Sequence, residues 1–258
     1  MFLAIDVGNT HTQFGVLRGT EVLATFRLTT ARRSTDELGV LVLTLLQHRG
    51  IAVEALEGAI ASCVVPGVLY GLEKAVKRYL GLEVMVVGRG LKTGLRIRTE
   101  NPKELGSDRI VNAVGARARW DGPLVVIDLG TATLFDCVDG RGDYLGGVIA
   151  PGFQVSQQAL ERRSARLPGV EVARPERTIG KNTSQAFQSG MFWGFVGLVD
   201  GLARRCREEL GGTATVVATG EWSALVGPAA EEVEHVEAWL TLTGLADLYG
   251  RNQATPRA

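Results

Sequence analysis

Two stretches of the chain decide the fold: FLAIDVGNT at residues 2–10 and LVVIDLGT at residues 124–131. Each is an apolar strand that ends in an Asp-x-Gly turn with a Thr close behind it. Each is followed by a second strand, around residues 14–17 and 133–136. The recurrence of this pattern about 120 residues apart predicts a duplicated nucleotide-binding scaffold. Because glycine lacks a Cβ atom, the two turns can bring backbone N–H groups close to an anion.

The carboxylates at the two strand ends, Asp6 and Asp128, need a different partner. A carboxylate repels phosphate, so we expect each to hold a cation or a cation-bound water. The polar run at residues 9–13 offers neutral donors to an anion. Its alternative interpretation is a polar hairpin turn, since Gly and Asn favour turns.

The bulk composition of the 258 residues is that of a globular chain, long enough for one large domain or two of ordinary size. Basic and acidic residues number 28 each, so a nucleic-acid or acidic-membrane surface is not expected. The three cysteines have no metal or redox spacing, which favours reduced thiols and a cytoplasmic location. The apolar N-terminal run stops at Asp6, as in a core strand rather than a signal peptide, and the apolar stretch 191–199 is too short to span a membrane.

Strand and helix signals predict two similar halves, residues 1–120 and 121–258, with a boundary near residues 121–123. In the first half we expect strands at 2–7, 13–17, 22–28, 59–63 and 83–87, and helices at 35–48, 68–79 and 102–119. In the second half we expect strands at 124–128, 144–150 and 215–218, and helices at 154–163, 183–210 and 239–249. Hairpin strands followed by alternating strands and helices imply an α/β fold, with a mixed sheet flanked by helices in each half.

The segment NPKELGSDR at residues 101–109 places an acid beside a base, ahead of an apolar helical face. Asp108 could serve as general base toward a bound hydroxyl, and Arg109 could pair with an anionic group or with transferring phosphate. We expect the adjacent Arg109 to favour the ionised form of Asp108. The alternative is an ordinary pair of solvated charges on a helix surface.

Glycines mark two further segments. Gly146-Gly147 and Pro151-Gly152 lie at the two ends of the strand 144–150, where glycine indicates either close approach of a ligand or backbone, or a plain β-bulge. The segment 180–183 leads into the longest predicted helix, with Asn182 or Thr183 as its N-cap, and a helix N-terminus suits an anion or polar ligand.

The longest helix carries a stripe of four glycines on one face, at positions 190, 194, 197 and 201. Each interior glycine costs roughly 1 kcal/mol relative to Ala. A stripe is therefore expected where another backbone packs closely. The sequence leaves open whether that backbone belongs to the same chain or to a second copy.

Several familiar site patterns are missing from the sequence. It contains no Gly-x-x-x-x-Gly-Lys-Ser/Thr loop, no Gly-x-Gly-x-x-Gly after a strand, no His or Cys pairs with zinc spacing and no Gly-x-Ser-x-Gly elbow. A P-loop is therefore excluded, and a dinucleotide, zinc or hydrolase site is not expected.

Together these segments resemble the type III pantothenate kinases, within the actin/Hsp70/sugar-kinase superfamily. The resemblance spans almost the whole chain and rests on residues 6–10, 62–66, 101–109, 128–131, 144–152, 180–183 and 188–190. It implies two duplicated ribonuclease H-like domains and ATP-dependent phosphorylation of pantothenate, the first step of coenzyme A synthesis. It further implies a homodimer, Mg²⁺, and a monovalent cation such as K⁺ or NH₄⁺.

The resemblance also implies roles for particular residues. Asp108 corresponds to the proton acceptor, Asp128 to a ligand of the monovalent cation, and Asp6 to a holder of Mg²⁺, directly or through water. The ATP contacts implied are Asp6, Val7, Gly8, Asn9, Thr10, His11, Thr12, Gln13 and Thr131. The pantothenate contacts implied are Gly106, Ser107, Asp108, Arg109 and Thr183.

Two positions depart from the family pattern. Ser107 stands where Ala is usual, a small change that we expect to be tolerated. Glu221 follows Gly220 where a second Gly is usual, which leaves nucleotide affinity and preference open. Two other functions remain: a kinase for another small hydroxylated substrate, or a non-enzymatic accessory regulator of transcription. The complete set of Asp6, Asp108, Arg109 and Asp128 favours the pantothenate kinase.

Overall fold

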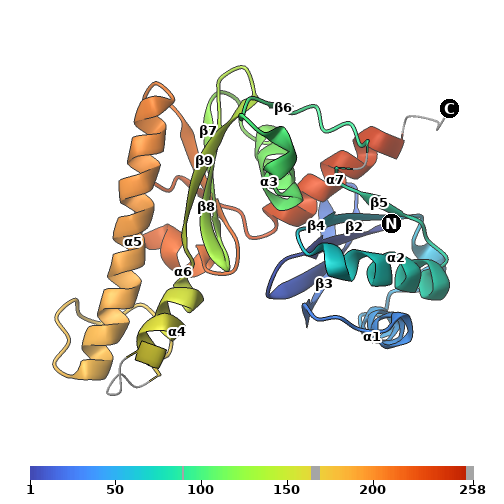
Figure 1. Ribbon diagram of the computed structural model, residues 1–258, viewed down its shortest axis with the longest axis horizontal. Coiled ribbons are helices and arrows are strands. Elements are labelled where there is room, and N and C mark those ends of the chain that lie inside the picture. Colours follow the sequence, from blue (N-terminus) through green and yellow to red (C-terminus); the bar gives the residue numbers. More distant parts are fainter. Residues whose placement is uncertain (89, 164–168, 254–258) are drawn as a thin grey trace. The chain divides into compact units, whose positions relative to one another are not determined.

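The computed structural model describes residues 1–88, 90–163 and 169–253, and its contacts divide the chain into two compact units (Figure 1). Unit 1 comprises residues Met1–Leu95, Asn101–Ala118 and the segment from Trp239 onward. Unit 2 comprises Arg96–Glu100 and Arg119–Ala238. The expected division into residues 1–120 and 121–258 therefore needs correction, because the last helix belongs with the N-terminal unit.

Unit 1 is built on a mixed five-stranded sheet of order β3-β2-β1-β4-β5. The first three strands are antiparallel neighbours, whereas β4 and β5 run parallel to β1. The strands are β1 (Phe2–Val7), β2 (His11–Arg18), β3 (Glu21–Thr29), β4 (Ala59–Cys63) and β5 (Val84–Val86). The helices are α1 (Thr35–His48), α2 (Pro66–Leu80), α3 (Ser107–Arg117) and α7 (Leu240–Gln253), with 3₁₀ turns at Val53–Ala55 and Pro102–Glu104.

Helices cover both faces of this sheet. On one face, alternate residues of β1 and β2 pack against α1 and α2 in a continuous apolar core that includes Ile5, Phe14, Val42 and Leu72. On the other face, α7 stacks Tyr249 on Phe2, with ring centroids 4.2 Å apart. This second packing is what places the C-terminal helix in unit 1.

The helices α3 and α7 cross at glycines. A Cβ atom at Gly115 would lie 2.9 Å from the carbonyl oxygen of Leu240 and 3.0 Å from the Cα of Gly244. At such a crossing any side chain would force the two helices apart. The close packing explains why α3, which carries the Asp108 segment at its start, is held firmly within unit 1.

Unit 2 is built on a mixed six-stranded sheet of order β11-β10-β7-β8-β9-β6. Its strands are β6 (Arg96–Ile97), β7 (Leu124–Leu129), β8 (Ala132–Val138), β9 (Asp143–Pro151), β10 (Thr215–Thr219) and β11 (His235–Val236). Its helices are α4 (Phe153–Arg163), α5 (Thr183–Glu209) and α6 (Ser223–Val226), followed by a 3₁₀ turn at Gly227–Ala229. The long helix α5 lies along one face of the sheet, where Phe192 and Val199 join Val125 and Phe135 in the core (Figure 1).

The predicted duplication is confirmed by the topology. Each unit begins with three antiparallel strands, β1-β2-β3 in unit 1 and β7-β8-β9 in unit 2. In each unit two further strands then run parallel to the first strand, β4 and β5 to β1, and β10 and β11 to β7. Asp6 pairs with Ser62 of β4, and Asp128 pairs with Thr219 of β10. The two aspartates therefore occupy equivalent positions at the ends of equivalent strands.

Helix positions agree with the sequence in most places. Ser34 caps α1 in a full capping box: it accepts a bond from the backbone N–H of Glu37, and the Glu37 side chain accepts one from the backbone N–H of Ser34. The single helix expected at 102–119 is instead a 3₁₀ turn followed by α3. Leu105 and Gly106 adopt extended conformations between the two, with ψ angles of 122° and 143°. The short strands β6 and β11 carry no alternating pattern and were not expected.

Candidate active site

The turn after β1 is closed by backbone and threonine hydrogen bonds. The N–H of Gly8 donates to the carbonyl of His11 at 3.0 Å, and the Thr30 hydroxyl donates to the carbonyl of Gly8 at 2.7 Å. Because the Thr30 proton is used there, the Thr12 hydroxyl must donate to Thr30 Oγ1 across 2.9 Å. Thr30, which directly follows β3, thus stabilises this turn by hydrogen bonds. No sequence motif predicted this role.

The predicted phosphate-binding residues divide between the two faces of the sheet. Asp6 lies opposite Gln13 on β2 and beside Ser62 on β4, so these three side chains share one face. Val7 and Thr12 form the next pair and point to the other face, where Val7 is part of the hydrophobic core. Val7 can therefore contribute only its backbone to a ligand, and the Thr12 hydroxyl is directed to Thr30.

The equivalent turn in unit 2 is enclosed by two glycines. Its backbone matches the first turn, with the N–H of Gly130 donating to the carbonyl of Ala132 at 3.1 Å. A Cβ at Gly152 would overlap the carbonyl oxygens of Gly130 and Thr131. A Cβ at Gly220 would overlap Oδ1 of Asp128. Asp128, Thr131 and the two glycines thus form one tight cluster.

The glycines of β9 serve two purposes. Gly152 confirms the expected close approach of backbone, since it lies against the Gly130–Thr131 turn. Gly146, with φ +133°, lies where the pairing of β8 and β9 shifts register. That position is the plain β-bulge of the alternative interpretation.

Asp108 lies at the start of α3, where its carboxylate folds back over Gly106. Oδ1 accepts the backbone N–H of Arg109 at 2.8 Å, and a Cβ at Gly106 would overlap this same oxygen. Gly106 is therefore required by the position of Asp108.

Burial raises the pKa of the Asp108 carboxyl above its usual value, and the backbone N–H and the charge of Arg109 oppose this increase without cancelling it. The expectation that Arg109 favours the ionised form holds for the contribution of Arg109 itself, but it left out the burial of the carboxyl. Arg109 favours the carboxylate, but removal of the group from water has the larger effect. A base with a raised pKa accepts a proton more readily near neutral pH.

The Ser107 side chain points toward β4. Its Oγ accepts the backbone N–H of Cys63 at 2.9 Å and lies 3.0 Å from Oγ of the fully buried Ser62. Unit 1 thus links the residues Gly106–Arg109 through β4 to the Asp6 turn, at the carboxyl ends of the neighbouring strands β1 and β4. Ser62 was part of a recognised segment of the sequence but had no role assigned to it.

Thr183 is the first residue of α5 and is exposed. Its neighbour Asn182 is the N-cap, with its side chain accepting the N–H of Gln185 at 2.9 Å. A Cβ at Gly180 would overlap the backbone N of Ala186, so the preceding chain lies tightly against the first turn of the helix. Asp128, Thr131 and Thr183 all belong to unit 2, whereas the other predicted site residues belong to unit 1.

The glycine stripe of α5 is open on its outer side. A Cβ at Gly190, Gly194 or Gly197 would meet no other atom of the described chain within 4 Å, apart from the helix's own backbone, and one at Gly201 would meet only the side chain of Arg205. Packing against another backbone of the same chain is therefore not found among the described residues. Packing of this stripe against a second copy stays a prediction.

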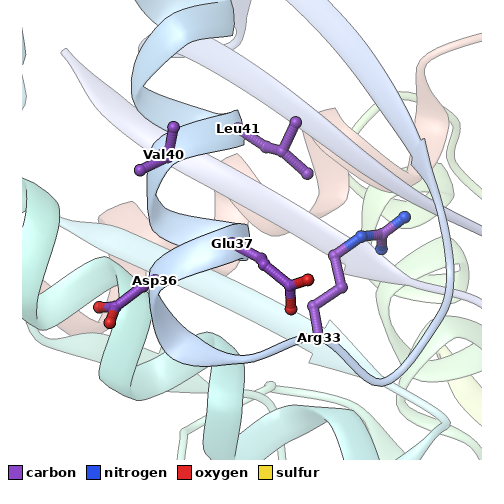
Figure 2. Close-up of a pocket in the computed structure, with 5 residues that line it drawn as sticks. All are labelled: Arg33, Asp36, Glu37, Val40 and Leu41. Carbon is purple, nitrogen blue, oxygen red and sulfur yellow. The ribbon is translucent and has the colours of Figure 1, made fainter.

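A cavity of about 500 Å³ lies elsewhere in unit 1, against the first turns of α1 (Figure 2). Its lining is Arg33, Asp36, Glu37, Val40 and Leu41. Glu37 is engaged in the capping box, which lowers its pKa, and Asp36 accepts the Tyr79 hydroxyl at 2.8 Å and pairs with Arg78. None of the predicted site residues lines this cavity.

The carboxylates at the strand ends suit hard cations, because carboxylate and hydroxyl oxygens are the ligands that Mg²⁺ and K⁺ take. Within residues 1–88, 90–163 and 169–253, no group of three or more His, Cys, Asp or Glu side chains is placed to hold a metal ion. That arrangement fits Mg²⁺ held by one carboxylate together with nucleotide phosphates and water.

Comparison with known proteins identifies a family for this chain. The model of the type III pantothenate kinase family matches residues 2–205. A curated type III pantothenate kinase from an Exiguobacterium species is 47% identical over 254 residues, which cover 98% of this chain and 100% of that protein. No helix in the described part of the chain is long and apolar enough to cross a membrane.

Solved structures of lower sequence identity share the fold. A Campylobacter jejuni protein described as a Baf family transcriptional activator has a TM-score of 0.61 at 18% identity, covering 98% of this chain and 100% of that one. A Porphyromonas gingivalis N-acetylglucosamine kinase has a TM-score of 0.53 at 14% identity, with the same coverage. At these identities the likeness concerns the fold alone.

Proposed function

We propose roles for individual residues from the premise that this chain belongs to the type III pantothenate kinase family. The reaction transfers a phosphoryl group from ATP to a hydroxyl of pantothenate, the first step of coenzyme A synthesis. Phosphoryl transfer depends on positioning and charge neutralisation more than on covalent chemistry. The observation that supports our assignment is the pair of equivalent Asp-x-Gly turns, with Asp108 held beside the first of them.

The turn after β1 is assigned to the phosphates of ATP. Its backbone from Gly8 onward and the side chains sharing the face of Asp6 can donate to phosphate oxygens. Asp6 would hold Mg²⁺, directly or through water; when bound, this ion neutralises phosphate charge. Thr12 and Thr30 keep the turn in shape through their hydrogen bonds.

Asp108 is assigned as the base that accepts the proton of the pantothenate hydroxyl. Its raised pKa suits proton transfer near neutral pH. Arg109 follows it on α3 and is assigned to an anionic group of the substrates, since a guanidinium matches carboxylate and phosphate geometry. Gly106 and Ser107 complete this substrate segment, and Thr183 is assigned as a further contact with pantothenate.

Asp128 is assigned to a monovalent cation, K⁺ or NH₄⁺, and Thr131 to ATP. The support is the equivalence of Asp128 with Asp6 and the tight enclosure of its carboxylate by Gly220. A cation held there would offset the repulsion between this carboxylate and phosphate. Gly152 fixes the backbone of the same turn from its other side.

We also assign the glycine stripe of α5 to a homodimer contact. Three of its four glycines face open space, and helices with small residues on one face can approach closely. The opposite face of α5 is occupied by the core of unit 2. The stripe is therefore the face available to a second copy.

The assignment of the base is tested by measuring ADP release with and without pantothenate in the wild type and in Asp108→Asn. Wild-type release should depend on pantothenate. The variant should lose turnover by about 10²–10⁴-fold, the usual contribution of a general base, while binding both substrates. Asp121→Asn, an exposed aspartate in the other unit, is the control and should be unaffected. Near-normal turnover of Asp108→Asn would exclude this role.

A further inference from the structure

Two serine hydroxyls join the start of α3, which carries Asp108, to β4, the strand beside Asp6. One belongs to Ser62 near the end of β4, and the other to Ser107 at the start of α3. Oγ of Ser107 accepts the Cys63 N–H at 2.9 Å and lies 3.0 Å from Oγ of Ser62. Ser62 is fully buried, and Ser107 precedes Asp108 in the first turn of α3. The backbone and side chain at the end of β4 are thus both bonded to the same hydroxyl of α3.

The position of this contact follows from the ladder of the sheet. The pairing of β4 with β5 ends at Ala61 and Val86, and the last bond on that side runs from the N–H of Val87 to the carbonyl of Ala61. The next N–H facing the same side is that of Cys63, because donors alternate between the two sides of a strand. Ser107 supplies the acceptor that β5 no longer provides.

The other side of β4 is bonded to β1. Asp6 and Ser62 are register partners, and the N–H of Val64 continues the ladder to the carbonyl of Val7 at 3.1 Å. The path from Asp6 to Asp108 therefore consists of one strand pairing, one hydroxyl contact and one peptide bond. All of it lies within unit 1.

We propose that Ser62 and Ser107 form a positioning clamp that holds Asp108 in a fixed place relative to the Asp6 turn. This proposal rests on the proposed function of both segments. The clamp uses the Ser107 hydroxyl, which is directed to β4, and leaves contact with pantothenate to the backbone of Ser107. It acts through Asp108, whose carboxylate already lies folded over Gly106 and has little room to adjust on its own.

The clamp supplies no group to the reaction itself, since both serine hydroxyls are used within unit 1. Its removal should therefore weaken alignment rather than abolish catalysis. A displacement of a catalytic group by about 1 Å can cost 10²-fold in rate. We expect a smaller loss, of roughly tenfold in kcat, for Ser107→Ala, with KM for pantothenate within about twofold of wild type.

The experiment compares Ser107→Ala, Ser62→Ala, the double variant and Ser107→Thr in steady-state kinetics. If the two hydroxyls act as one unit, the double variant should be no slower than the slower single variant. Ser107→Thr keeps the hydroxyl and should restore most of the lost kcat. Amide hydrogen exchange at Cys63 is measured in parallel and should accelerate in Ser107→Ala, because that N–H loses its acceptor.

Ser34→Ala is the matched control, because it also removes a serine from the start of a helix in unit 1, but from α1, which carries none of the assigned site residues. It should lower the melting temperature without lowering kcat. The proposal is overturned if Ser107→Ala keeps kcat within twofold, or if the two single losses add. A failure of the proposed function would look different, since the wild type itself would then release no pantothenate-dependent ADP.

Discussion

Gly220 lies directly against the carboxylate of Asp128, so closely that a Cβ at position 220 would overlap Oδ1 and come 2.7 Å from the backbone N of Leu129. The backbone of Gly220 has a φ of +92°, which side chains rarely allow. In unit 1 the equivalent position, directly after the partner of Asp6, is occupied by Cys63. The two duplicated turns therefore differ in how tightly their aspartates are enclosed.

Gly220→Ala should abolish most of the activation by K⁺. The added methyl group would displace the Asp128 carboxylate, and the positive φ would add strain. The measurement is turnover against K⁺ concentration, with Na⁺ and a bulky organic cation as references. Wild-type activity should be low in either reference buffer, and the variant should respond little to any of the three.

The control for backbone strain is Gly211→Ala. Gly211 has a φ of +91°, and a Cβ there would meet nothing within 4 Å. This variant should lose stability through backbone strain alone, without a steric clash, and should keep its K⁺ response. Equal K⁺ responses in the two variants, or full wild-type activity without K⁺ or NH₄⁺, would contradict a cation site at Asp128.

Ionisation of Asp108 should lower the stability of the folded protein as the pH rises. Burial raises the folded-state pKa of this carboxyl above the unfolded value of about 3.9, so the native state binds its proton more tightly than the unfolded chain does. The stabilisation from the protonated form is fully present below pH ~3.9 and is lost as pH rises through the folded pKa. Asp108→Asn, which cannot ionise, should therefore raise the melting temperature at neutral pH.

That gain in melting temperature should shrink as the pH is lowered toward 4. Asp121→Asn serves as the reference, because Asp121 is exposed. A melting temperature of Asp108→Asn that stays parallel to wild type between pH 4 and pH 8 would show that burial does not govern this carboxyl.

Thr30→Val should weaken ATP binding while leaving pantothenate binding unchanged. The substitution preserves shape but removes the hydroxyl that donates to Gly8 and accepts from Thr12. A hydrogen bond of this kind contributes about 0.5–1.5 kcal/mol, so KM for ATP should rise roughly 2- to 12-fold. Thr20→Val, in the exposed β2–β3 turn, is the control. A higher KM for pantothenate alone would argue against a phosphate-binding role for this turn.

Gly194→Leu should weaken the homodimer without unfolding the protomer. Position 194 is open within the described chain, so leucine fits there in the monomer but not in a close helix contact between copies. Sedimentation or light scattering gives the molecular mass. Gly250→Leu is the matched control, since Gly250 is also a helical glycine with open space around it. A dimer that persists in Gly194→Leu with an unchanged melting temperature would remove the stripe from the interface.

Local features of the sequence were enough to predict the duplicated architecture. The strand pattern and the Asp-x-Gly turn concern neighbouring residues, and both copies form the same strand topology. The capping box at Ser34 is likewise a matter of four consecutive residues. These features can be predicted because their energies depend on the alternation of apolar and polar residues, on turn conformation and on helix capping within a short stretch of chain.

By itself, then, the sequence determined the two equivalent turns and the chemistry that their residues can perform. Only the tertiary structure decided that α7 packs in unit 1, that Ser107 bonds to the end of β4, and that Gly152 and Gly220 enclose the second turn. It also decided that burial outweighs Arg109 in setting the pKa of Asp108. The physical reason is common to all four: close packing and burial arise between segments far apart along the chain, and neither spacing nor residue type specifies which segments meet.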